Sequence, residues 1–226
     1  MNAAIILSGG TGTRMGMDVP KQYMMAGERP VISYCIDVFE KTDLIDKLLV
    51  VAAEGYRDLI SSLFTDKGKL IGFADPGQNR QLSILNGLKA LEGVLKDDDN
   101  VIIHDAARPL ISEKLICELI EGLECSDAVL PILPMKDTVY EIEDSRVIDN
   151  LDRSRIGAGQ APEGFKYGKY LKANEELLPD RIFEISGSMQ PAVMKKMNIK
   201  CIPGDEMNFK ITTPADLERF KELITG

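Results

Sequence analysis

Residues 3–16 read AAIILSGGTGTRMG, and this stretch decides the fold of the chain. The apolar run Ala3–Leu7 is short and ends in a serine and two glycines, which is typical of a buried strand that stops at a tight turn. Ligands of open α/β sheets bind beyond the carboxyl ends of strands, where glycines let backbone N–H groups approach phosphate oxygens. The stretch therefore predicts a first strand followed by a phosphate-binding turn.

Two common phosphate-binding motifs do not fit this turn. A P-loop needs Gly-Lys-Ser/Thr after its glycines, and no such run occurs here. The dinucleotide fingerprint G-x-G-x-x-G begins at Gly10 and Gly12, but Met15 stands in the position of its third glycine. The basic residues Arg14 and Lys21 are instead placed to grip a triphosphate. A tight strand-to-helix turn with no ligand is the alternative interpretation.

Outward from this turn, strand-like and helix-like segments alternate, which predicts crossover connections and a mainly parallel, Rossmann-like sheet. The expected fold is an α/β three-layer α/β/α sandwich, with residues 1–226 as a single domain. Further strands are predicted at Leu48–Ala53, Leu70–Ala74, Asn100–His104, Asp127–Leu133 and Lys200–Pro203. Helices are predicted at Val31–Lys41, Leu82–Leu95, Glu113–Leu123, Lys166–Glu176, Met189–Lys196 and Pro214–Ile224, the last with Thr213 as its N-cap.

The segment Pro134–Ala158 departs from this alternation. It is polar, and its two short strand-like runs, Asp137–Ile142 and Arg146–Ile148, are separated by the turn-like residues 143–145. We predict two antiparallel strands that project from the core as an arm, residues 134–158.

The charge and composition exclude several classes of protein. With 27 basic and 36 acidic residues the net charge is 27 − 36 = −9, which argues against nucleic-acid binding and requires a local basic cluster for any anionic substrate. The N-terminus does not resemble a signal peptide, and no run reaches the ~18 apolar residues of a membrane span, so a cytoplasmic location is expected. Four cysteines without C-x-x-C spacing and a single histidine do not suggest zinc.

The motifs resemble those of the cytidylyltransferases that act on methylerythritol phosphate and ribitol phosphate. This family has the fold of nucleotide-diphospho-sugar transferases, so the resemblance implies one nucleotidyltransferase domain. Six strings follow the family in order along the chain: GGTGTRMG with PKQY (residues 9–23), GQNRQLS with NGL (77–88), HDAARP (104–109), KDT (136–138), DR (152–153) and NFKITTP (208–214).

The resemblance implies an enzyme that transfers CMP from CTP to a phosphorylated polyol and releases pyrophosphate, with Mg²⁺ as cofactor. The acceptor would be 2-C-methyl-D-erythritol 4-phosphate, D-ribitol 5-phosphate or a related polyol phosphate. Both reactants are anionic, so cations must neutralise them in the transition state. The implied catalytic residues are Arg14, Lys21 and Lys210. The implied nucleotide contacts are Ser8, Gly9, Gly10, Thr11, Gly12, Thr13, Gly77, Arg80, Ser83 and Ala106.

Asp105 is the expected Mg²⁺ ligand, because a carboxylate at the end of an apolar strand needs a partner or a metal. A helix N-cap or an ion pair with Arg108 is the alternative. His104 is expected to be a packed, hydrogen-bonded residue at the strand end. By resemblance, Arg108, Thr138 and Arg153 bind the acceptor. Family members exchange their arms in a homodimer, so Thr138 and Arg153 are expected to serve the neighbouring subunit; ordinary polar residues on a hairpin are the alternative.

Two departures from the family fall on the acceptor side. Residues 160–163 read QAPE where the family has Q-T-P-Q, so Ala161 lacks a hydroxyl that would contact the acceptor phosphate. Residues 185–192 read ISGSMQPA in place of an acidic segment. The reaction class is therefore better determined than the acceptor. Two alternatives stay open: a uridylyl- or guanylyltransferase acting on a sugar phosphate, and a non-catalytic nucleotide-binding protein of the same fold.

Overall fold

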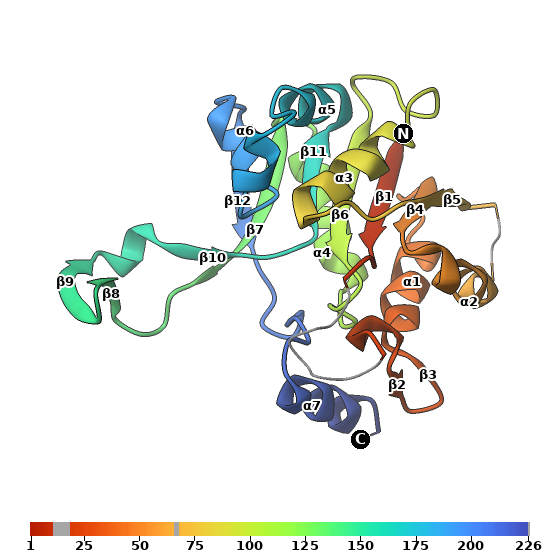
Figure 1. Cartoon of the computed structure of the whole chain (residues 1–226), viewed down its shortest axis with the longest axis horizontal. Helices are drawn as coiled ribbons and strands as arrows, with labels where there is room; N and C mark the ends of the chain where they lie inside the picture. The colour runs from red at the N-terminus through yellow and green to blue at the C-terminus, as the bar shows by residue number, and fades with distance from the viewer. Residues whose placement is uncertain (11–18, 66–67, 226) are drawn as a thin grey trace.

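The computed structural model describes residues 1–10, 19–65 and 68–225, and its largest sheet is flanked by helices (Figure 1). Within these residues the strand order is β10-β7-β11-β6-β1-β4-β5, and β12 also pairs with β7. The strands are β1 (Asn2–Leu7), β4 (Lys47–Val51), β5 (Leu70–Ala74), β6 (Asn100–Asp105), β7 (Ala128–Pro134), β10 (Gly157–Gly159), β11 (Glu163–Lys166) and β12 (Ile199–Pro203).

The pairing confirms a mainly parallel sheet. Strand β1 pairs in parallel with β4 and β6, β4 with β5, and β7 with β12. Strands β10 and β11 run antiparallel to β7, and β11 also pairs antiparallel with β6. The sequence pattern missed β11, because a four-residue strand directly after a proline gives too short a hydrophobic pattern.

Helices cover both faces of the sheet, as the three-layer prediction requires. Alternate side chains of β1 enter opposite cores: Ala4 and Ile6 pack with α1 and α4, whereas Ala3 and Ile5 pack with α3 and α5. The helices are α1 (Val31–Lys41), α2 (Arg57–Leu63), α3 (Arg80–Lys89), α4 (Glu113–Gly122), α5 (Tyr167–Glu175), α6 (Gln190–Met194) and α7 (Pro214–Thr225). Short 3₁₀ turns are η2 (Lys21–Tyr23), η3 (Glu54–Tyr56), η4 (Arg153–Arg155) and η5 (Arg181–Glu184).

Helix α3 differs from the predicted helix Leu82–Leu95 at both ends. It begins at Arg80, because the Asn79 side chain accepts a hydrogen bond from the N–H of Leu82 at 2.7 Å and caps the helix. It ends at Lys89, although Leu91 and Leu95 beyond it are buried. The regular leucine spacing therefore marks buried residues in the turns after the helix as well as in the helix itself.

The C-terminal helix α7 packs beside a small hairpin of β2 (Met25–Ala26) and β3 (Arg29–Pro30). Phe220 and Leu217 join Ala26 and Ile211 in a separate apolar cluster. The predicted cap of α7 is present, since the Thr213 hydroxyl accepts a hydrogen bond from the N–H of Asp216 at 3.2 Å.

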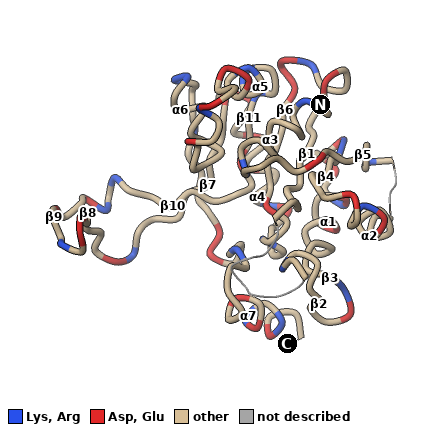
Figure 2. Tube along the Cα trace, viewed as in Figure 1, with Lys and Arg blue, Asp and Glu red and all other residues tan. Residues whose placement is uncertain are grey.

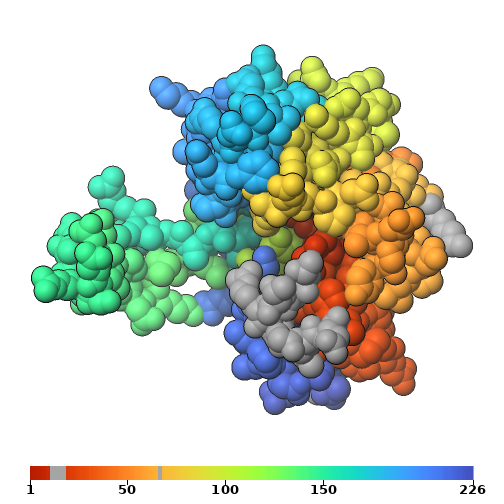
Figure 3. Space-filling view, in the orientation of Figure 1, coloured from red at the N-terminus to blue at the C-terminus, as the bar shows by residue number. Residues whose placement is uncertain are grey.

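The arm is a hairpin of β8 (Val139–Glu143) and β9 (Arg146–Leu151), which projects from the body as a separate lobe (Figures 1 and 3). Figure 2 shows residues of both charge signs along it. The predicted bounds were too wide, because Pro134 closes β7 and Gly157 and Ala158 belong to β10, all in the main sheet. Four apolar side chains on the arm are exposed, by 51–65%: Tyr140, Ile142, Val147 and Ile148.

Candidate functional site

The end of β1 is held by a short helical turn from later in the chain. The hydroxyl of Ser8 donates to the hydroxyl of Tyr23 at 2.7 Å, and Tyr23 in turn donates to the carbonyl of Ser8 at 3.0 Å. The Gln22 amide donates to the carbonyls of Ser8 and Gly10, both at 2.8 Å. These bonds fix η2, and with it the half-buried Lys21, against the turn that follows β1.

The described residues include the first part of the turn that was predicted to bind phosphate. Ser8, Gly9 and Gly10 stand at the end of β1, as predicted. The predicted residues Thr11, Gly12, Thr13 and Arg14 lie outside the described residues.

A second glycine loop follows β5 and packs against the first. A Cβ on Gly9 would lie 2.6 Å from Cβ of Pro76, and a Cβ on Gly77 would lie 2.6 Å from Cβ of Leu82. The Ser83 hydroxyl accepts a hydrogen bond from the N–H of Gly77 at 2.9 Å and donates to the carbonyl of Asn79. Ser83 therefore shapes the loop around Gly77, and both glycines allow backbone approaches that a side chain would block.

Asp105 collects three cations at the end of β6. It pairs across the sheet with Leu7, the last residue of β1, so it lies beside the glycine turn. Its Oδ1 accepts from Nε and Nη2 of Arg80 at 3.1 and 3.0 Å, and its Oδ2 accepts from Nζ of Lys210 at 2.9 Å. The Nε of Arg108 lies 3.9 Å from Oδ2. The structure thus brings together four predicted residues, of which Lys210 lies more than 100 positions along the chain from the other three.

The cations determine the charge of Asp105. Burial alone would raise its pKa, but Arg80, Lys210 and Arg108 outweigh burial and hold the pKa of Asp105 well below its ordinary value. For Arg80, the reverse holds: burial acts to lower its pKa, but Asp105 and Glu163 raise it. Asp105 is therefore an ionised carboxylate, and Arg80 stays fully charged.

Glu163, at the start of β11, is a functional candidate that sequence reasoning missed as a site residue. It is 7% exposed and pairs through the backbone with Ile103, two positions before Asp105. Burial raises the pKa of Glu163 to about 7, although Arg80 acts in the opposite direction. No hydrogen bond or ion pair joins its carboxyl group to another residue in the described part of the chain. The only signal was a carboxyl after Ala161-Pro162, in a strand that was not predicted.

Arg108 is held in place by the turn around it. Its Nη1 donates to the carbonyl of Asn208 at 2.8 Å, and Nε2 of His104 lies 3.0 Å from the Arg108 carbonyl. Burial lowers the pKa of His104 to about 4, so this imidazole is neutral near pH 7 and its N–H donates. His104 is therefore the packed, hydrogen-bonded residue that was predicted.

The loop that carries Lys210 is fastened to the segment before β11. The Asn208 amide donates to the carbonyl of Ala161 at 2.8 Å. The Gln160 amide group bonds the Asp205 backbone on both sides, donating to its carbonyl at 2.8 Å and accepting from its N–H at 3.0 Å. Gln160 and Asn208 are both buried, so these bonds position Lys210 from behind the site.

The other predicted residues behave differently. Ala106 is buried, and its N–H already donates to the carbonyl of Leu7 at 3.0 Å. Thr138 and Arg153 are exposed at the base of the arm, just before β8 and just after β9. The arm projects from the body of the same chain (Figure 1). Arg153 donates through Nη1 to the carbonyl of Lys136 at 2.7 Å, which ties the two ends of the arm together.

The described residues contain no group of three or more His, Cys, Asp or Glu side chains that could hold a metal ion. Mg²⁺ nevertheless often binds through one or two carboxylates, with substrate phosphates and water as its other ligands. A single ionised Asp105 fits that donor set. Nor does any helix in the described ranges have the length and apolar character needed to cross a bilayer.

Glycine loops at the carboxyl ends of parallel strands, beside a group of cations, suit a nucleotide polyphosphate, and in this fold they define a nucleotidyltransferase. The model of the IspD family, described as 2-C-methyl-D-erythritol 4-phosphate cytidylyltransferase, matches residues 2–225. The chain belongs to this family of cytidylyltransferases, and the resemblance inferred from the six strings is confirmed.

Similar proteins carry two different acceptors in their names. A 2-C-methyl-D-erythritol 4-phosphate cytidylyltransferase of Geobacter metallireducens is 30% identical, covering 95% of this chain and 93% of its own. A ribitol-5-phosphate cytidylyltransferase of Streptococcus agalactiae serotype V is 31% identical, covering 99% and 95%. The crystal structure of 4-diphosphocytidyl-2C-methyl-D-erythritol synthase from Anaerococcus prevotii superposes with a TM-score of 0.85 at 25% identity, covering 100% and 96% of the chains.

Proposed function

We propose that this chain transfers CMP from CTP to a phosphorylated polyol and releases pyrophosphate. The observation that carries the proposal is the cluster of Arg80, Arg108 and Lys210 on Asp105, directly beside the turn after β1. Three cations facing one full carboxylate charge leave a net positive site in a chain of net charge −9. Such a site attracts the triphosphate and the acceptor phosphate together.

The chemistry follows from this charge. An oxygen of the acceptor phosphate attacks the α-phosphorus of CTP, and pyrophosphate leaves from the opposite side. Because the nucleophile is already anionic, no general base is needed, and catalysis consists of positioning and neutralising charge. We assign Lys21 and Lys210 to the α-phosphate, Arg14 to the β- and γ-phosphates, and the Ser8–Gly10 and Gly77–Ser83 loops to the nucleotide.

Mg²⁺ would bind to Asp105 and to oxygens of the triphosphate. When bound, the ion adds positive charge to the phosphates during transfer. The carboxylate of Asp105 accepts hydrogen bonds from Arg80 and Lys210. These two cations must therefore bind the triphosphate instead before the carboxylate is able to bind a metal ion. The described cluster is thus arranged to receive the metal and the nucleotide together.

The acceptor is proposed to lie at Arg108, whose planar guanidinium suits a phosphate. Names of similar proteins make 2-C-methyl-D-erythritol 4-phosphate and D-ribitol 5-phosphate the first acceptors to test. Ala161 is buried at 5% exposure and offers only a methyl group. The acceptor phosphate is therefore expected to rely on arginine more than on hydroxyl groups.

The arm is proposed to pack against a second copy of the chain in a homodimer. A two-stranded hairpin is marginally stable alone, and two of its apolar side chains, Ile142 and Val147, are exposed by more than 60%. Burial against a partner would remove this surface from water, and Thr138 and Arg153 would then approach the partner's acceptor site. Light scattering tests this assignment; a monomer at micromolar concentration would contradict it.

The central experiment combines four nucleoside triphosphates with a panel of phosphorylated polyols and sugars and follows pyrophosphate release with Mg²⁺ present. Turnover is expected with CTP and a polyol phosphate. Turnover with UTP or GTP but not CTP would overturn the base assignment. Lys21→Ala is expected to abolish turnover and to leave the circular dichroism spectrum unchanged. Lys114→Ala, at a side chain that is 82% exposed on α4, is the matched control.

A further inference from the structure

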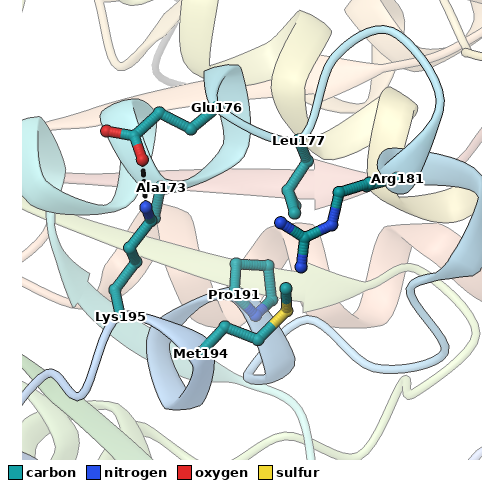
Figure 4. Close-up of a pocket in the computed structure, with 7 residues that line it drawn as sticks. All are labelled: Ala173, Glu176, Leu177, Arg181, Pro191, Met194 and Lys195. Atoms are coloured by element: carbon teal, nitrogen blue, oxygen red, sulfur yellow. Dashed lines mark hydrogen bonds and ion pairs between the residues drawn. The ribbon is translucent and has the colours of Figure 1, made fainter.

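A pocket lies between α5 and α6 (Figure 4), and none of its lining residues belongs to the Asp105 cluster. It has a volume of about 250 Å³, and its wall combines the apolar residues Ala173, Leu177, Pro191 and Met194 with three charged side chains. The volume corresponds to about eight water molecules at ~30 Å³ each. The pocket therefore suits a small ligand rather than a nucleotide.

One positive charge in this pocket has no partner among the residues that the structure describes. The Arg181 guanidinium points into the pocket between Leu177 and Met194 (Figure 4), and it makes no hydrogen bond or ion pair with the described remainder of the chain. The other cation in the wall, Lys195, is already paired with Glu176. The net charge of the pocket is thus +1, set by a group that binds carboxylates and phosphates in a bidentate manner.

Several exposed apolar side chains lie on the segments that form the pocket. Met194 lines the pocket and is 38% exposed, and Leu178 and Val193, each next in sequence to a lining residue, are exposed by 42% and 59%. Phe183, two positions after Arg181, is 50% exposed. Clustered apolar side chains around a concavity mark a binding site more often than isolated ones do.

We propose that the α5–α6 pocket binds a small organic anion with a compact aliphatic group, and that its occupancy alters the nucleotide site. The anionic head would bind Arg181, and the aliphatic group would fill the space beside Leu177, Pro191 and Met194. A short-chain phosphate monoester and a short-chain carboxylate share this chemistry. n-Butyl phosphate has about nine non-hydrogen atoms and hexanoate about eight, which matches the volume of about eight water molecules.

The route to the nucleotide site runs through α5. Asn174 follows the pocket residue Ala173, is fully buried, and accepts a hydrogen bond from the Gln81 amide at 2.5 Å. Gln81 is next to Arg80, the residue that grips Asp105 with two hydrogen bonds. A ligand that moves α5 relative to α6 therefore acts on the first turn of α3 and on the hold of Arg80. This half of the proposal rests on the proposed function.

Binding is tested without reference to activity. The full chain is labelled with ¹³C in its methionine methyl groups, the Met194 signal is assigned with Met194→Leu, and n-butyl phosphate and hexanoate are titrated. A saturable shift of that signal is expected, with inorganic phosphate and butanol much weaker. Arg181→Gln should weaken binding about tenfold or more. Arg146→Gln, at an exposed arginine on the arm, is the control.

The possible outcomes separate the parts of the proposal. An unmoved Met194 signal, or equal binding by Arg181→Gln, would overturn the site. Equal binding of inorganic phosphate would overturn the aliphatic part. The coupling is read from the KM for CTP, which saturating butyl phosphate should change at least twofold in the wild type and leave unchanged in Arg181→Gln. Binding at Met194 with the KM for CTP unaltered would overturn the coupling and leave the proposed function standing.

Discussion

Glu163→Gln tests the electrostatics of the site through stability rather than activity. The carboxyl of Glu163 is 7% exposed, and burial raises its pKa from 4.5 to about 7. The folded state therefore holds this proton more tightly than the unfolded state does. Its contribution to stability is fully present below pH 4.5 and is lost as the pH rises through about 7.

The magnitude follows from the two pKa values. The difference is 7 − 4.5 = 2.5 pH units, which corresponds to about 3 kcal/mol at roughly 1.4 kcal/mol per unit. Roughly 2 to 3 kcal/mol of this is lost between pH 5 and pH 8. Glutamine has nearly the same shape and stays neutral, so Glu163→Gln escapes the loss. The difference in free energy of unfolding between the variant and the wild type is therefore expected to shift by about 2 kcal/mol in favour of the variant from pH 5 to pH 8.

The measurement is urea denaturation of both proteins at pH 5 and pH 8, at one fixed protein concentration because an oligomer makes stability concentration-dependent. Glu54→Gln, at an exposed carboxyl before α2, is the matched control and should alter stability equally at both pH values. An identical pH response in Glu163→Gln and wild type would refute the reasoning. So would a variant that is less stable at pH 8, because it would mean that an ionised Glu163 is stabilised by Arg80.

Three other perturbations follow from the geometry. Lys210→Gln should lower kcat by about 10²- to 10³-fold, with a loss of under ~1 kcal/mol in urea denaturation, since Arg80 still holds Asp105; normal turnover would remove Lys210 from the mechanism. Gly77→Ala should lose about 1–3 kcal/mol, because its Cβ would lie 2.6 Å from Leu82, whereas Gly187→Ala, with nothing within 4 Å, should not; equal melting temperatures would contradict this contact. In calorimetry, Mg²⁺ alone should show no binding and should bind once CTP is present, because three cations repel it; tight binding of Mg²⁺ to the free protein would argue against this order.

The parts of the fold that sequence could predict are those with a repeated pattern. The continuous apolar runs of β1, β4 and β6 identified buried parallel strands, and the polar excursion after β7 identified the arm. Strand β11 could not be found in this way, because its four residues are too few for a period to show. The missed helix α2 has a single fully buried residue, Ile60, so it too lacks a readable apolar face.

The site, like the fold, was predictable only where a local sequence pattern marks it. Motif strings placed Asp105 and Lys210 as functional residues, but no string states that Arg80 and Lys210 bind different oxygens of one carboxylate. Such a contact depends on tertiary packing between distant segments. Glu163 was not predicted as a site residue for the same reason, because it is buried by a strand that the sequence pattern does not reveal.

Strand β1 is hydrogen-bonded to a neighbouring strand on each side, and this restricts where the chain tolerates insertions and deletions. Its residues are paired one by one with β4 and with β6, while successive side chains belong to opposite cores. Removing one residue would send Ala4 and Ile6 into the wrong layer and would draw the glycines back from Asp105 by about 3.3 Å. Insertions and deletions accumulated over evolution should therefore gather in the arm and spare the first ten residues.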